Sequence, residues 1–143
     1  TLRRRQFRAA SLGGEVAVNP QGREYGTVKI TLRDTARTDP LFASLPRRFA
    51  AHASHTQTVL RLPPGATWLA ASERDHHHAY RFGESIWGVQ FHPEFDIFAM
   101  RAYIDMNADS LRAQGDDPDQ LRASITDTPH AAGLLRRFAE LAS

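Results

Sequence analysis

Apolar and polar residues alternate with a period of two in several short segments of the first two-thirds of the chain. This pattern is typical of β-strands that bury one face. It is clearest in GTVKITL, where Val28, Ile30 and Leu32 occupy every second position. Turn-forming residues separate the segments, as in Asn19-Pro20-Gln21-Gly22 and at Gly83-Glu84. The pattern predicts strands at residues 16–18, 26–32, 49–52, 58–62, 68–72, 78–82 and 85–91.

The hydrophobic period changes to about 3.6 residues after Glu94, which is the period of an amphipathic helix. We predict one helix here, ending at Gly115. Its apolar stripe is Ile97, Met100, Ile104, Ala108 and Leu111. Asp117-Pro118 and Thr128-Pro129 predict two further helix starts, because a capping residue precedes a proline in each. Weaker signals predict helices at residues 3–12 and, in short form, after Asp39-Pro40.

The order of these elements predicts an α/β protein in which antiparallel strands are followed by C-terminal helices. A length of 143 residues suits one domain with a substantial core. Neither an internal repeat nor a linker divides the sequence. We therefore expect residues 1–143 to form a single domain, or part of one.

Composition narrows the classes of function. With 41% hydrophobic and 24% charged residues the chain resembles a soluble globular protein, and no apolar run is long enough to predict a membrane span. The absence of cysteine excludes disulfides and thiolate metal sites, and it favours a cytoplasmic location. A net charge of +2 is too small to predict a nucleic-acid or membrane partner. We interpret Arg3-Arg4-Arg5 as a solvated terminus rather than a phosphate-binding arm.

The string GVQFHPEF places a histidine and a carboxylate directly after an apolar strand. Because Pro93 favours an extended backbone at His92, the side chains of His92 and Glu94 are expected on the same side. A carboxylate in that position can fix the tautomer of an imidazole that acts as a general base. The alternative is a histidine that ends a strand, followed by a glutamate that caps the next helix.

A wider set of motifs resembles the class I glutamine amidotransferases, and especially their GMP-synthetase-like members. The motifs are WGVQFHPEF, LGGEV, REYG and SHTQTVLRLPPGATWLAAS, in the order that the family has them. The resemblance covers about residues 6–110 and leaves 111–143 as a helical tail. It implies part of a three-layer, flavodoxin-like α/β fold and glutamine as substrate. It also implies that His92 is the general base, that Glu94 orients it, and that no cofactor is needed.

The sequence departs from the family at the nucleophile. Counting back from LGGEV places Gln6 on the motif's glutamine and Arg4 on a glycine. Leu2 falls on the catalytic cysteine, which leucine cannot replace. We expect no ammonia release from this chain, which would be either a truncated enzyme or an inactive binding or regulatory module. The resemblance also implies missing N-terminal strands, so we expect a second copy or a partner chain to cover an exposed sheet edge.

The remaining candidates surround two histidine-containing segments. The resemblance implies that Gln6, His55 and Gln57 bind the glutamine substrate, although Gln57 stands where the family has an aspartate. A buried, hydrogen-bonded loop histidine is the alternative for His55. The run Asp75-His76-His77-His78 invites a metal site, but alternating side chains bring at most two of its imidazoles together. We therefore predict a solvated loop there and no metal site.

Overall fold

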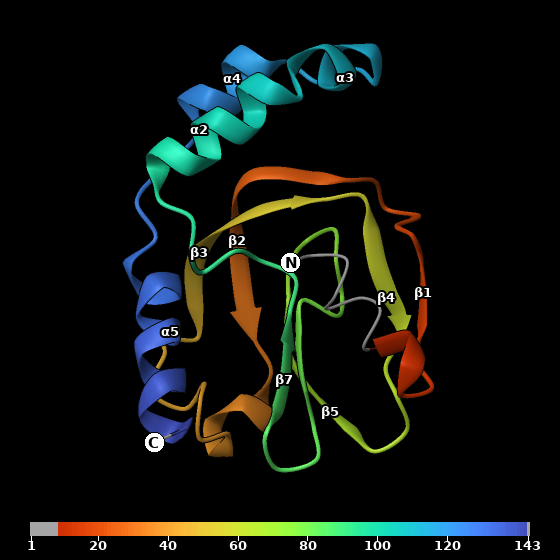
Figure 1. Cartoon of the computed structure of the whole chain (residues 1–143), viewed down its shortest axis with the longest axis vertical. Coiled ribbons are helices and arrows are strands. Elements are labelled where there is room, and N and C mark those ends of the chain that lie inside the picture. Colours follow the sequence, from red (N-terminus) through yellow and green to blue (C-terminus); the bar gives the residue numbers. More distant parts are fainter. Residues whose placement is uncertain (1–8, 143) are drawn as a thin grey trace.

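Two antiparallel sheets form the framework of the chain, in a computed structural model that describes residues 9–142. The larger sheet has five strands in the order β3-β2-β5-β6-β7, and the smaller pairs β1 with β4 (Figure 1). The strands are β1 Glu15–Val18, β2 Glu24–Leu32, β3 Arg48–His55, β4 Gln57–Arg61, β5 Ala66–Ala71, β6 Ala79–Phe82 and β7 Ile86–Val89. All seven predicted strands are therefore confirmed, although several bounds differ.

Strand β2 organises the larger sheet because it pairs with β3 on one side and β5 on the other. Its alternating residues Ile30 and Leu32 are buried, as the period of two predicts. The strand begins two residues earlier than predicted, and this extension pairs Glu24 with His55. This added pair places the polar side chains of Glu24 and His55 in the interior of the molecule.

The main core lies between the larger sheet and α5. It contains side chains from β2, the segment after the short 3-10 helix η1 (Asp34–Thr38), the strands β3, β5 and β6, and the segment after β7. Phe42, Leu69 and Phe91 are fully buried there. Helix α5, Pro129–Ala142, adds Ala131 and Leu134 to the same core. The C-terminal helix is thus packed against the sheet.

The predicted long helix is wrong in one respect, because it is divided into α2 (Ile97–Met106) and α3 (Ala108–Ala113). Asn107 lies at the break, and its side-chain amide donates a hydrogen bond to the carbonyl of Tyr103. Asparagine competes in this way with the helical hydrogen bonds of the backbone, so the helix ends there and restarts. The end at Gly115 is confirmed, since this residue has a φ of +93°.

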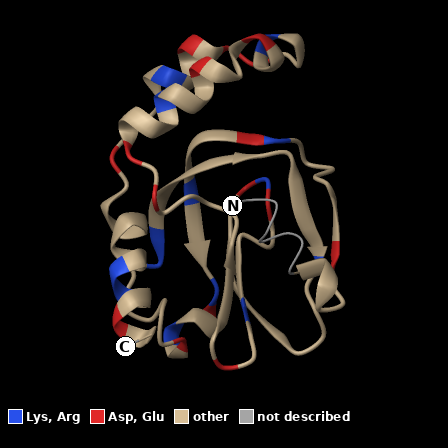
Figure 2. Cartoon of the chain, viewed as in Figure 1, with Lys and Arg blue, Asp and Glu red and all other residues tan. Residues whose placement is uncertain are grey.

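Helices α2, α3 and α4 (Pro118–Ala123) project from one end of the sheet, whereas α5 lies alongside β3 (Figure 1). Met100, Ile104, Leu111 and Ile125 form a second, smaller core in this helical part. Basic and acidic residues are interspersed on these helices (Figure 2). No helix in the described part of the chain is both long and apolar enough to cross a bilayer.

The region after β2 differs from the prediction of a short helix after Asp39-Pro40. The 3-10 helix η1 precedes Asp39, and only turns follow it. The buried carboxylate of Asp39 accepts hydrogen bonds from the backbone N–H groups of Leu41 and Phe42. These bonds satisfy a turn without continuing into a helix.

Candidate active site and a buried charge cluster

His92 lies three residues after the end of β7. Contacts of its backbone and of its ring hold it in place. Its backbone N–H donates a 2.8 Å hydrogen bond to the carbonyl of His52 on β3. Its ring stacks on Phe95, with centroids 4.1 Å apart and planes 7° apart. The residue is only 4% exposed. Backbone and ring contacts within the protein therefore fix the position of the imidazole independently of any substrate.

Glu94 contacts the ring of His92 as the sequence predicts. Glu94 Oε1 lies 2.7 Å from His92 Nδ1, and the glutamate side chain remains 44% exposed. An ionised carboxylate only accepts hydrogen bonds, so Nδ1 must carry the proton. In the neutral ring the lone pair is then on Nε2, which is the arrangement a general base needs.

Among the residues that the structure describes, the hydroxyl of Ser54 on β3 faces this lone pair. Ser54 Oγ lies 3.4 Å from His92 Nε2, and both residues are buried. The distance is long for a hydrogen bond to a hydroxyl. Ser54 does not lie in the tight strand-to-helix elbow that exposes a catalytic serine, so we do not assign it as a nucleophile. A side chain at position 54 can therefore reach Nε2 of His92.

The other candidates from the sequence lie elsewhere. Leu2, Arg4 and Gln6 are outside the described residues. Gln57 is the exposed first residue of β4, and its backbone carbonyl lies 2.9 Å from His55 Nδ1. His55 is buried at the end of β3 and hydrogen-bonded, which corresponds to the second of its two interpretations. Its contact with glutamine stays a prediction.

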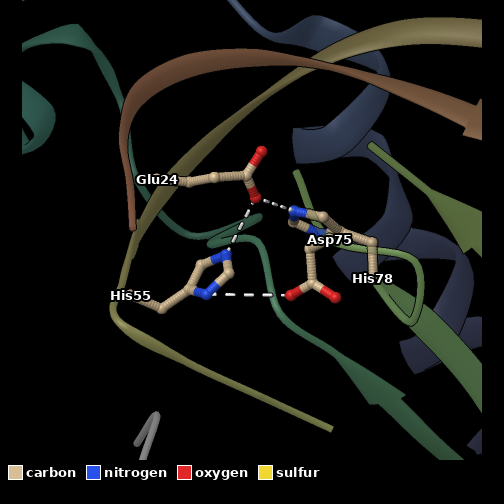
Figure 3. Close-up of side chains that lie close together, drawn as sticks. All are labelled: Glu24, His55, Asp75 and His78. Atoms are coloured by element: carbon tan, nitrogen blue, oxygen red, sulfur yellow. Dashed lines mark hydrogen bonds and ion pairs between the residues drawn. The ribbon is translucent and has the colours of Figure 1, made fainter. Parts of the chain in front are cut away.

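Four buried side chains form a cluster that sequence reasoning did not assemble. These are Glu24, His55, Asp75 and His78, called here the Glu24 cluster (Figure 3). Glu24 Oε1 lies 3.0 Å from His55 Nε2 and 2.8 Å from His78 Nε2. Asp75 Oδ2 lies 3.7 Å from His55 Nδ1. Two carboxylates and two imidazoles thus come together away from water.

The prediction of a solvated histidine loop is wrong for Asp75 and His78, which are 1% and 0% exposed. Asp75 accepts hydrogen bonds from the hydroxyl of Thr58 and the N–H of His77. The backbone N–H of His78 donates to the carbonyl of Ala70, and this bond places His78 at the start of β6. These bonds turn the two ends of the run inward, while His76 remains exposed.

The environment of the cluster shifts two pKa values in opposite directions. Burial alone would raise the pKa of Glu24, but hydrogen bonds from His55, His78 and Ser72 outweigh it and hold this pKa well below its usual range. Burial alone would lower the pKa of His55, but its hydrogen bond to Glu24 and the charge of that carboxylate raise it. Both shifts favour a charged pair.

The composition of the cluster could not be read from a local motif. Its members come from β2, β3, the loop after β5 and the residue before β6, and only Asp75 and His78 are close in sequence. The one local signal is their separation by two histidines, which a solvated loop explains equally well. The resemblance of REYG to a family motif assigns no role to Glu24. The pairing of β2 with β3 places Glu24 beside His55.

Comparisons with known proteins found similar sequences and a similar fold. The family described as glutamine amidotransferase class-I matches residues 5–106. One subunit of the glutamine-hydrolysing GMP synthase of Thermococcus kodakarensis is 31% identical over 137 residues, which are 95% of this chain and 55% of that protein. The glutamine-hydrolysing GMP synthase of Thermosipho africanus is 40% identical over 83 residues, 57% of this chain and 15% of that protein.

A solved structure shows the same fold. The crystal structure of a glutamine amidotransferase from Thermotoga maritima superposes with a TM-score of 0.79 at 27% identity, over 96% of this chain and 58% of that one. The chain thus spans little more than half the length of this protein and of the Thermococcus relative. The antiparallel strands and following helices are shared with solved amidotransferases.

Proposed function

This chain belongs to the class I glutamine amidotransferase family, and we propose that His92 and Glu94 form the general-base half of a glutamine-hydrolysing site. The observation that carries the proposal is the 2.7 Å contact between His92 Nδ1 and Glu94 Oε1. It leaves the lone pair on Nε2, at a fixed position from which it can accept a proton. The alternative of a glutamate that only caps the next helix is not supported, because Asp96 occupies the N-cap of α2.

In the proposed reaction, His92 Nε2 takes the proton of a nucleophile as that nucleophile attacks the side-chain amide of glutamine. The same nitrogen then gives the proton to the departing ammonia. Glu94 stabilises the imidazolium that exists between these two steps. Glu94 is partly exposed, while burial of His92 limits the positions that the ring can take.

The nucleophile is not in this chain, which has no cysteine. Removal of a triad nucleophile leaves binding and weak residual effects only. The same observation favours the second candidate, a binding or regulatory module on this fold. For the whole protein we propose a glutamine-dependent function with a second polypeptide, because one relative is named as one subunit of an enzyme.

We expect a protein with the printed sequence to release no ammonia from glutamine above the rate of a blank. The chain has a base but no thiol to activate, so the variant His92→Gln should give the same result. A coupled assay that detects ammonia at high protein concentration measures this. Turnover that disappears in His92→Gln would show that another group serves as nucleophile. It would contradict the proposal that this chain supplies the base but not the nucleophile.

A further inference from the structure

The Glu24 cluster has the arrangement of a metal site in which every ligand is buried. One ligand atom from each of Glu24, His55, Asp75 and His78 lies within 4.8 Å of the other three. Their side chains are at most 4% exposed. Figure 3 shows the four side chains converging from β2, β3 and the segment between β5 and β6. Such a group needs an explanation, because buried charges are otherwise expensive.

The hydrogen bonds of His55 show where a cation is needed. His55 Nδ1 lies 2.9 Å from the carbonyl of Gln57, which can only accept, so Nδ1 carries a proton. In the neutral ring, Nε2 then points a lone pair at Glu24 Oε1, 3.0 Å away. Two acceptors at this distance repel each other unless a proton or a metal ion lies between them.

Charge balance and an unpaired oxygen atom favour the metal ion. Glu24 and Asp75 contribute two negative charges, which one divalent cation neutralises while both imidazoles stay neutral. Asp75 Oδ2 is buried and has no hydrogen-bond partner in the described part of the chain. A protonated His55 also balances the charge of Glu24, but it leaves Asp75 Oδ2 with only a 3.7 Å contact to His55 Nδ1, whereas a bound ion gives this oxygen a ligand role.

The outer contacts are those that support metal ligands. The carbonyl of Gln57 orients His55, and the hydroxyl of Ser72 donates to Glu24 Oε2 at 2.7 Å. The hydroxyl of Thr58 donates to the second oxygen of Asp75. Hydrogen bonds of this kind fix the tautomer and direction of ligating groups. Each therefore leaves the inward-facing atom available for an ion.

The distances also fit. Glu24 Oε1 lies 2.8 Å from one imidazole nitrogen and 3.0 Å from the other. Ligands of a tetrahedral zinc ion are about 3.4 Å apart, so binding requires these three atoms to separate by a few tenths of an ångström, while the most distant pair in the cluster, up to 4.8 Å apart, must close. Glu24 and Ser72 line a cavity of about 350 Å³, so this cavity borders the cluster on the Glu24 side.

We propose that Glu24, His55, Asp75 and His78 bind one divalent transition-metal ion of the zinc class. Two imidazoles and two carboxylates suit such an ion, and four protein ligands leave no open position for substrate. The site therefore ties together β2, β3 and the entry to β6, separately from the His92–Glu94 pair. It does not depend on the proposed function of that pair.

Calorimetric titration of the chelator-stripped chain with zinc chloride tests the proposal. We expect one ion per chain, and a cobalt(II) spectrum with the intense visible bands of a tetrahedral site. His78→Gln should weaken zinc binding at least about a hundredfold, because it removes a direct ligand, and loss of supporting contacts alone costs ten- to a hundredfold. The matched control is His76→Gln, an exposed neighbour in the same run, which should bind zinc like the unmodified chain.

Asp75→Asn provides a second variant, since its amide oxygen can still accept from Thr58 and His77 while the anionic ligand is lost. It should weaken zinc binding without preventing folding. The proposal is overturned if the unmodified chain binds no zinc or gives an octahedral cobalt spectrum. It is equally overturned if folded His78→Gln or Asp75→Asn binds as tightly as His76→Gln, because the ion would then lie on surface histidines.

Discussion

Replacement of Glu24 with alanine is expected to lower the free energy of unfolding by about 3–5 kcal/mol, measured in urea with chelator present. Glu24 is 5% exposed, and its Oε1 atom lies within 3.0 Å of nitrogen atoms of His55 and His78. Removal of the carboxylate leaves a buried imidazole without its counter-charge and the hydroxyl of Ser72 without its acceptor. Loss of one partner from a buried pair is more harmful than loss of both.

Glu73→Ala is the control for this prediction, because Glu73 is exposed and nearby in the fold. Its effect should stay within about 0.5 kcal/mol. A loss below about 1 kcal/mol in Glu24→Ala would mean that the interactions of the cluster contribute little net stability, as they do at exposed pairs. That result would contradict the description of the cluster as a buried, mutually dependent set of charges.

Phe91→Ala is expected to destabilise the fold by about 3–5 kcal/mol, because it empties a fully buried aromatic position. The ring of Phe91 meets Phe49 edge-on at 6.0 Å and stacks on His78 at 5.9 Å. The residue also precedes His92 directly, so its removal loosens both the core and the start of the candidate active site. Thermal and urea unfolding followed by circular dichroism measure the loss.

Phe98→Ala provides the matched control, since Phe98 is 77% exposed on α2. It should change the free energy of unfolding by no more than about 0.5 kcal/mol. Phe91→Leu should fall between the two, because leucine retains part of the buried volume. Equal effects in Phe91→Ala and Phe98→Ala would contradict the assignment of Phe91 to the main core.

The local pattern of the sequence predicts much of this fold. Strand periodicity locates each member of the two sheets, and Pro93 predicts that His92 and Glu94 face one another. Both features depend on neighbouring residues, so they are visible in a short window. The pattern does not predict the break at Asn107, because the apolar stripe continues across it and the competing hydrogen bond is made by a single side chain.

The Glu24 cluster could not be predicted in the same way. Glu24 reaches His55 only through the register of β2 on β3, and it reaches His78 through the tertiary packing of β6. Register and packing join residues 31 and 54 positions apart in the chain. Hydrophobic periodicity contains no information on such pairs, so a histidine run that is partly buried looks the same as an exposed one.

The proton-accepting role of His92 is tested most directly by a thiol introduced beside its Nε2 atom. Ser54→Cys places sulfur where the hydroxyl now lies 3.4 Å from Nε2, in a chain with no other cysteine. Thiolate absorbance at about 240 nm during a pH titration gives the pKa of this thiol without requiring access by a reagent. Ser85→Cys, on the exposed turn before β7, gives the reference near the ordinary value of about 8.5.

We predict that the thiol pKa in Ser54→Cys is about 1 to 3 pH units lower than in the double variant Ser54→Cys, His92→Gln, because the imidazole accepts the thiol proton and stabilises the thiolate. Both variants bury the sulfur equally, so burial cancels in the comparison. The same thiol pKa in the two variants would contradict the account, because His92 would then be a structural histidine rather than a base.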